Sequence, residues 1–176
     1  MAEYFIADLH FGHRNMAIKR GFKDENEHDE FIIQMWNSVV TKRDVVTIIG
    51  DVTMEKSANY ILLNRLNGIK RVILGNHDMQ NHVPKLLLHV NSVAGMVKKK
   101  FHEERLTVFI THCPIHPREF RKGRVKLNIH GHIHEYKVKK FFNLIEDKRY
   151  INVSCEQIDY MPRTIKELLT LNNIKL

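Results

Sequence analysis

The sequence has few cysteines and no long apolar run, and each absence excludes a class of protein. Cys113 and Cys155 are too few for a disulfide framework, so we expect two free thiols. No stretch approaches the ~20 apolar residues of a membrane-spanning helix. The first residues carry no basic segment of the kind that opens a secretory signal, so we expect a cytoplasmic protein with no membrane partner. Repeats, low-complexity segments and linkers are also missing, which favours a single domain over residues 1–176.

Positive charge and histidine are plentiful instead. Lys and Arg number 28 against 20 Asp and Glu, and the formal net charge of +8 favours anionic partners without identifying one. The 12 histidines are the more unusual feature. Most of them stand beside Asp, Asn or Gly at the ends of apolar runs, which is typical of metal ligands.

The spacing of apolar residues predicts an α/β protein. Short apolar or β-branched runs predict strands over 3–7, 45–49, 71–74, 92–97, 98–102, 106–110, 125–129 and 150–154. Helical spacing predicts helices over 26–40, 56–66, from about 79 to 89, and over 164–169. The first three strands alternate with helices, which indicates a parallel core sheet, whereas the runs between 92 and 110 are typical of hairpin strands. We expect the acidic start of the first helix to be solvated, and Ile61, Leu62 and Leu66 to point inward.

Polar side chains follow the apolar runs where the strands are expected to end. They are Asp8-Leu9-His10, Gly50-Asp51, Gly75-Asn76-His77-Asp78, Thr111-His112 and His130-Gly131-His132-Ile133-His134. Because the carboxyl ends of strands in an open α/β sheet meet at one edge, we expect these stretches to form one site. Asp8 and His10 are two residues apart, as are His132 and His134, so extended backbone would point each pair to one side.

The chemistry of this set favours divalent metals. It offers two carboxylates, one amide oxygen and several imidazoles, and we expect Cys113 to be packed rather than coordinating. Such ligands suit Mn, Fe, Zn, Ni or Co, and there are about enough for two ions with Asp51 as the bridge. Two such ions against two carboxylates leave a charge of about +2, which matches a phosphate ester.

Each stretch alone has a structural alternative. An Asp after a strand is often a cap or turn residue, and His112 alone would be interpreted as a core histidine. Asn-His-Asp could be a turn in which Asp78 caps the next helix. Three imidazoles in five residues are costly unless something uses them, and all five stretches in this order favour a functional site.

This order of motifs resembles that of the calcineurin-like metallophosphoesterase superfamily, over residues 8–134. It is most similar to small single-domain bacterial and phage phosphoesterases in which Phe-Gly-His follows the first motif. The resemblance implies a four-layer α/β/β/α sandwich with a two-metal centre, for which Mn²⁺ is the favoured metal.

The resemblance also implies a role for each motif residue. The first metal would be held by Asp8, His10 and His134, the second by Asn76, His112 and His132, and both by the bridging Asp51. His77 would contact the phosphate and assist the leaving group, while a hydroxide activated by the metals attacks in line. Asp78 would orient a neighbour or cap a helix, and His130 stays outside the ligand set.

Three functions remain open. The leading one is a phosphodiesterase acting on nucleotide or nucleic-acid substrates, because without a large cap domain an open site admits a second ester arm. The others are a phosphomonoesterase with the same metals and a catalytically silent metal-binding scaffold for protein or nucleic acid. Candidate substrate-binding residues are His13, Arg14, Arg118 and Arg121. These assignments have structural alternatives: His13 could support His10, and Arg118 and Arg121 could belong to a solvated basic loop.

Overall fold

The computed structural model describes residues 1–140, 142 and 144–174, and only the backbone of 121–123. The strands are β1 (Glu3–Ile6), β2 (Val45–Ile49), β3 (Ile69–Ile73), β4 (Ser92–Ala94), β5 (Val97–Phe101), β6 (Leu106–Ile110), β7 (Leu127–His130), β8 (Tyr150–Asn152) and β9 (Arg163–Thr164). The α-helices are α1 (Arg14–Lys19), α2 (Glu25–Val39), α3 (Val83–Leu86) and α4 (Ile165–Leu171). The 3-10 helices are η1 (Ser57–Arg65), η2 (Gln80–His82), η3 (Pro117–Gly123) and η4 (Cys155–Gln157). Within these described residues, no helix is both long and apolar enough to cross a membrane.

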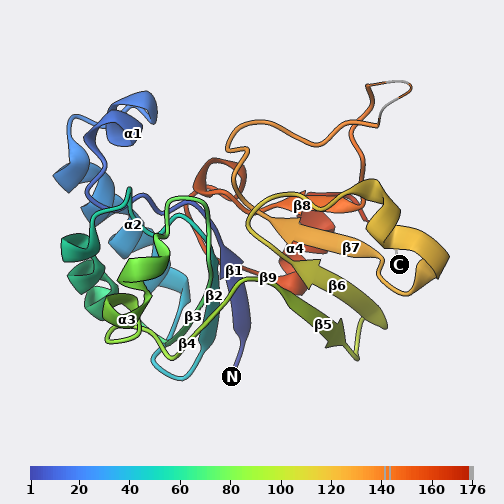
Figure 1. The fold of residues 1–176 in the computed structure, drawn as a ribbon, viewed down its shortest axis with the longest axis horizontal. Helices are drawn as coiled ribbons and strands as arrows, with labels where there is room; N and C mark the ends of the chain where they lie inside the picture. Colours follow the sequence, from blue (N-terminus) through green and yellow to red (C-terminus); the bar gives the residue numbers. More distant parts are fainter. Residues whose placement is uncertain (141, 143, 175–176) are drawn as a thin grey trace.

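The strands form two sheets in a mixed α/β fold (Figure 1). The first sheet has the order β4-β3-β2-β1-β9, and its strands β1 to β4 are parallel, which confirms the predicted parallel core sheet. Every residue of β2 is buried, as expected of a strand covered on both faces. Helices α1, α2 and α3 lie on the side of this sheet that faces away from the second sheet (Figure 1), and α2 buries Ile32, Ile33 and Trp36.

The chain passes from the first sheet to the second between β4 and β5. β4 ends at Ala94 and pairs in parallel with β3, so the prediction of a hairpin strand over 92–97 is wrong. The strand with which so short a segment pairs depends on which sheet edge lies next to it in the folded chain. The local sequence does not encode this choice. β5 and β6 do form an antiparallel hairpin, and the second sheet continues in parallel through β7 and β8.

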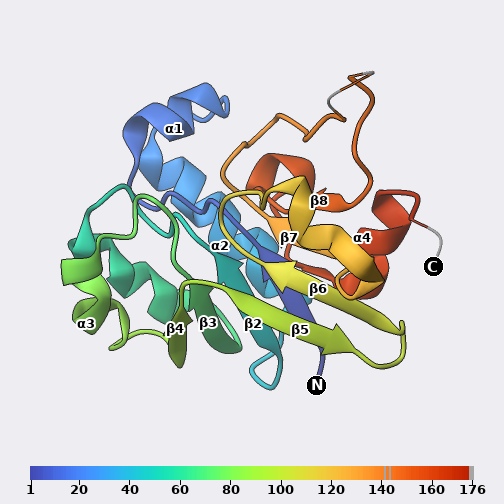
Figure 2. The same cartoon turned by 45° about the vertical axis from the view of Figure 1, so that its right-hand side comes forward.

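The two sheets share one hydrophobic core. In β6 the burial alternates, so that Leu106, Val108 and Ile110 face this core. The ring of Phe101 on β5 meets that of Phe5 on β1 edge-to-face, with centroids 6.0 Å apart. In Figure 2 the second sheet lies in front of the first, which agrees with a core between them. The two sheets are therefore held together by side chains from both.

The acidic residues at the start of α2 do not all face solvent. Asp24 caps the helix by accepting a hydrogen bond from the backbone N–H of Glu27 at 2.9 Å. Asp29 is only 6% exposed, because its carboxylate accepts from the backbone N–H of Gly12 and lies beside His28 Nδ1, both at 2.9 Å. The prediction of a solvated face is therefore wrong for Asp29, which ties α2 to the loop after β1.

Residues 57–65 form a 3-10 helix rather than the α-helix that the apolar spacing suggested. A 3-10 helix has three residues per turn, so buried positions recur every third residue, at Tyr60 and Leu63 and, just past the helix, at Leu66. Ile61, which was expected to point inward, is 56% exposed. The error follows from applying the α-helical period of 3.6 residues.

We expect Leu63→Ala to lower the free energy of unfolding by about 2–5 kcal/mol, because it leaves a cavity at a fully buried position. Ile61→Ala, two residues away on the exposed side, should change it by no more than about 0.5 kcal/mol. Urea unfolding followed by the fluorescence of Trp36 measures both. Equal losses in the two variants would contradict the 3-10 register.

Candidate metal centre

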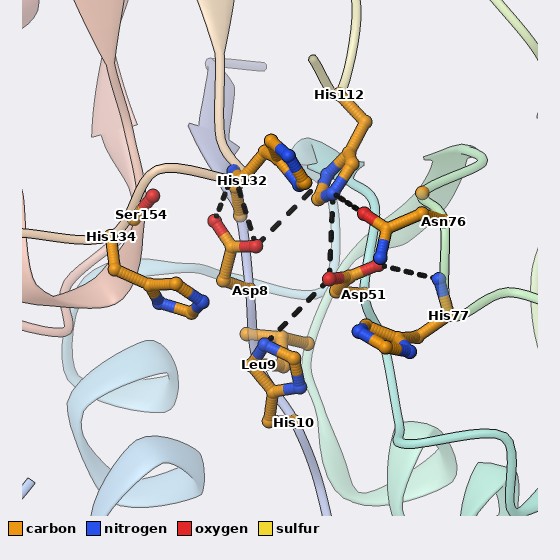
Figure 3. Close-up of polar contacts among 12 residues, drawn as sticks. Asp8, Leu9, His10, Asp51, Asn76, His77, His112, His132, His134 and Ser154 are labelled. Atoms are coloured by element: carbon orange, nitrogen blue, oxygen red, sulfur yellow. Dashed lines mark hydrogen bonds and ion pairs between the residues drawn. The ribbon is translucent and has the colours of Figure 1, made fainter. Parts of the chain in front are cut away.

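The polar stretches come together where the two sheets touch. Just past the end of β1, the N–H of Ala7 donates to the carbonyl of Val153 at 2.8 Å, and that of Cys155 donates to the carbonyl of Ala7 at 3.2 Å. Beside this junction lie the predicted ligands and the predicted catalytic residue, namely Asp8, His10, Asp51, Asn76, His77, His112, His132 and His134 (Figure 3). Five separate segments of the chain therefore contribute side chains to one cluster.

The backbone is left-handed at several residues of this cluster. The φ angle is 60° at Asp8, 50° at His10, 52° at Asp51, 72° at His132 and 47° at His134. Such a conformation costs a non-glycine residue about 1–3 kcal/mol, and functional sites are one place where it clusters. Both Asp-x-His and His-x-His thus reach the centre through tight turns, and the expectation of extended backbone is wrong.

Two buried carboxylates occupy the middle of the cluster. Asp8 is 0% and Asp51 2% exposed. Asp8 accepts from the backbone N–H of His132 at 3.0 and 3.2 Å, and Asp51 Oδ2 lies 3.4 Å from His112 Nε2 and 3.7 Å from His10 Nε2. In the described part of the chain, histidines are the only basic side chains within 4.0 Å of either carboxylate. Buried charges of this kind require compensation.

His10 shows that these residues fit a metal ion. Its ring is 2% exposed, and neither Nδ1 nor Nε2 has a hydrogen-bond partner. Unpaired polar atoms are costly when buried, so an unpaired imidazole beside two carboxylates indicates a cation as the missing partner. Burial lowers the pKa of His10 to about 3, so the ring is neutral and offers a lone pair.

Three sets of side chains have ligand atoms close enough to share an ion. Within each set these atoms lie within 4.8 Å of one another, and the sets are Asp8, His10 and His134; Asp8, Asp51 and His112; and His112, Cys113 and His132. Asn76 Oδ1 adds an oxygen 3.0 Å from His112 Nε2. Cys113 was expected to be packed, but it is exposed and its Sγ belongs to the third set. The cluster could therefore hold metal at more than one position.

His112 has an electrostatic environment opposite to that of His10. Burial disfavours its charged form, but the hydrogen bond and charge of Asp51, followed by the charge of Asp8, raise the pKa of His112 to about 9. Burial disfavours the charged form of Asp51 as well, yet the hydrogen bond and charge of His112 lower the pKa of that carboxyl below its usual value. The pKa of Asp8 rises to about 6 because burial dominates. The ring of His112 donates from Nδ1 to the carbonyl of Ile49 at 2.9 Å, and its Nε2 faces Asp51 and Asn76.

Two motif glycines are required by close approach. A Cβ at Gly75 would overlap the side chain and backbone of Asp51, and one at Gly131 would overlap Asp8 and Ala7. Neither position has a positive φ. Gly75 and Gly131 therefore let neighbouring loops meet at the carboxylates.

Asp78 orients the loops beneath the centre. It is 6% exposed, its Oδ2 accepts from the backbone N–H groups of Asp51 and Gly75 at 2.8 Å, and its Oδ1 accepts from that of Val52 at 3.1 Å. The next helix, η2, has Met79 at its N-cap and no side-chain cap bond. Of the two structural roles that the sequence left open, the contacts support the orienting one.

The sequence analysis missed two carboxylates that contact the cluster. Glu55 Oε1 lies 3.3 Å from His77 Nδ1, and Glu156 Oε1 lies 3.1 Å from His134 Nδ1. Glu55 stands in a loop and Glu156 in η4, and neither belongs to a motif. No local pattern distinguishes them from surface acids, so only the folded chain could identify them.

The predicted substrate-binding residues are placed differently from one another. The ring centroid of His13 lies 5.7 Å from that of His10, whereas Arg14 is largely exposed and 3.5 Å from Glu25. Arg118 is exposed on η3, whose Phe120 packs against Tyr150 in the second sheet. The side chain of Arg121 lies outside the described residues. Substrate binding by these four residues stays a prediction.

Metal binding is expected to release a proton from His112. The protein groups alone raise its pKa to about 9, so the ring is protonated below that pH and must lose a proton to become a ligand. Calorimetric titration of metal-free protein in buffers of different ionisation enthalpy should therefore count about one proton from this residue near pH 7.5 and about half near pH 9. His112→Gln should lack this proton, and an unchanged count in that variant would refute the assignment.

Comparison with known proteins finds relatives of this chain in phages. No protein-family model matches it. A protein of unknown function from Aquifex aeolicus shares the fold, with a TM-score of 0.72 at 22% identity over 97% of this chain and 98% of that one. A structure reported as a novel archaeal phosphodiesterase has a TM-score of 0.54 at 16% identity, over 89% of this chain and 86% of its own. The Gene 66 protein of Mycobacterium phage L5 is 31% identical over 158 residues, which cover 74% of this chain and 76% of that protein. The chain therefore belongs to the same family as the mycobacteriophage Gene 66 protein.

Proposed function

We propose that this protein is a metal-dependent phosphodiesterase that uses two divalent ions, with Mn²⁺ favoured. The observation that carries the proposal is the pair of buried carboxylates, Asp8 and Asp51, beside the unpartnered ring of His10. The motif order of the metallophosphoesterases and the shared fold with an archaeal phosphodiesterase support it. The two sheets with helices outside the first also support the four-layer α/β/β/α order of that superfamily.

The ligands divide between two positions around Asp51. Asp8, His10 and His134 would hold one ion, while Asn76, His112 and His132 would hold the other. Bound there, the ions would supply positive charge for the phosphoryl oxygens and lower the pKa of water. Asp51 can serve both positions, because its Oδ2 lies near both His10 and His112.

His77 is placed to act on the leaving group. Its backbone N–H donates to Asp51 Oδ1 at 3.0 Å, which fixes the residue beside the carboxylates, and its ring lies 6.1 Å from that of His10. The side chain remains 27% exposed, so a bound ester can reach it. A ring that donates from Nδ1 to Glu55 and from Nε2 to a leaving oxygen carries a proton on both nitrogens, which is the form that acts as a general acid.

The open rim of the centre favours a diester substrate. Asn76, Cys113 and His132 are all exposed, although they stand next to buried ligands. A second ester arm therefore has access to the centre, and the charge of +8 favours a polyanionic substrate such as a nucleotide or nucleic acid.

We expect metal-free protein to be inactive and to hydrolyse bis(p-nitrophenyl) phosphate once Mn²⁺ is added, with chelation reversing the effect. A panel of p-nitrophenyl phosphate, cyclic nucleotides, dinucleotides and single- and double-stranded DNA and RNA then locates the substrate. Faster turnover of the monoester would make the protein a phosphomonoesterase. Bound metal without hydrolysis of any ester would identify a scaffold and overturn the proposal.

His77→Asn should keep its metal content and lose about 10²–10⁴-fold in kcat, because it removes the proton donor but no ligand. His89→Asn is the matched control, since His89 contacts Asn64 at 3.0 Å outside the cluster. Metal analysis and diester turnover measure both variants. Wild-type kcat in His77→Asn would show that the ring takes no part in the reaction.

A further inference from the structure

We propose that Glu156 is a positioning residue that fixes the tautomer and orientation of His134 for the first metal position. The inference rests on the function proposed above, because it assigns His134 to a metal. Glu156 Oε1 lies 3.1 Å from His134 Nδ1, and both side chains are less than one-fifth exposed. No motif contains Glu156, which reaches the centre from η4, near the C-terminal end of the chain.

The contact determines which nitrogen of His134 faces the centre. A carboxylate oxygen only accepts hydrogen bonds, so Nδ1 carries a hydrogen, and in the neutral ring Nε2 keeps the lone pair. His134 belongs to the set whose ligand atoms lie within 4.8 Å of Asp8 and His10, and its ring stacks on that of His10 at 5.3 Å. A metal-binding histidine whose other nitrogen donates to a carboxylate is both oriented and made more basic.

Arg20 holds Glu156 and the turn at Asp8 in a fixed relation. Its side chain is 1% exposed, and its Nε donates to Glu156 Oε1 at 2.8 Å. Through Nη2 the same guanidinium donates to the backbone carbonyl of Asp8 at 2.8 Å. One buried cation thus connects the residue that orients His134 to the backbone that carries Asp8. Through these contacts Arg20 restricts how far His134 and Asp8, two candidate ligands of the first position, can move apart.

His132 has no comparable support. Among the described contacts its backbone N–H binds Asp8, and no carboxylate hydrogen-bonds its ring, which packs against that of His112 at 5.0 Å. The ring of His132 is therefore an internal reference for any measurement that follows His134.

The experiment compares Glu156→Gln and Glu156→Ala with the matched variant Glu135→Gln. Glu135 is the neighbour of His134 in sequence, but its carboxylate pairs with Lys19 at the surface, so this variant removes the same charge and no contact to the ring. Long-range ¹H–¹⁵N correlation spectra of metal-free protein report the tautomer of each histidine. Competition with a chromophoric chelator reports the affinity for Co²⁺, and the visible absorption of bound Co²⁺ reports its ligand geometry.

At a pH where the rings are neutral, we expect His134 to carry its hydrogen on Nδ1 in the wild-type protein and to lose this preference in Glu156→Ala, while His132 keeps its spectrum. Co²⁺ affinity should fall about 10-fold in Glu156→Gln, whose amide oxygen can still accept, and about 100-fold in Glu156→Ala. Glu135→Gln should bind like the wild type. An unchanged tautomer and unchanged affinity in a folded Glu156→Ala protein would overturn the proposal.

Two controls keep the result interpretable. Glu156→Ala removes one acceptor of Arg20, whereas Glu156→Gln retains an amide oxygen in its place. Circular dichroism of the metal-free proteins establishes whether each variant is folded. If Glu156→Ala does not fold, Glu156→Gln decides, and wild-type Co²⁺ affinity and spectrum in that variant would overturn the proposal. Wild-type protein that binds Co²⁺ but hydrolyses no ester would refute the proposed activity while leaving the role of Glu156 intact.

Discussion

Two carboxylates, Asp8 and Asp51, are buried beside histidines, and in the described part of the chain neither forms an ion pair with lysine or arginine. The free energy of placing such charges in a protein interior is unfavourable unless cations or hydrogen bonds compensate them. Backbone N–H groups of His132 and His77 provide part of this compensation. The ring of His10 has no hydrogen-bond partner, so the centre could accept a cation as a further partner.

The fold is built to bring these groups together despite the local cost. Left-handed backbone at Asp8, His10 and Asp51 turns their side chains toward one point just past the strand ends. Gly75 and Gly131 allow the loops of separate sheets to approach the carboxylates, which any larger residue would prevent. The compensating free energy comes from the core shared by the two sheets, in which residues such as Phe5 and Phe101 are packed.

Around the candidate ligands lies a second set of polar residues that orients several of them. Asp78 fixes the loops that carry Asp51 and Gly75, and Glu55 contacts His77. Arg20 reaches from the end of α1 to both the turn at Asp8 and Glu156. Buried hydrogen-bonded networks of this kind restrict side-chain rotation, so they limit the orientations of the side chains that they contact.

The sequence by itself determined the identity and order of the metal-site candidates, because each follows an apolar run that ends at a sheet edge. It also determined the parallel core sheet, since strand and helix periods alternate over the first 74 residues. It could not determine the three-residue period of η1, the burial of Asp29 or the sheet that β4 joins, because these depend on packing. Only the tertiary structure decided which residues support the ligands. Arg20 and Glu156 are 136 positions apart, and an interaction over such a separation leaves no local pattern in the sequence.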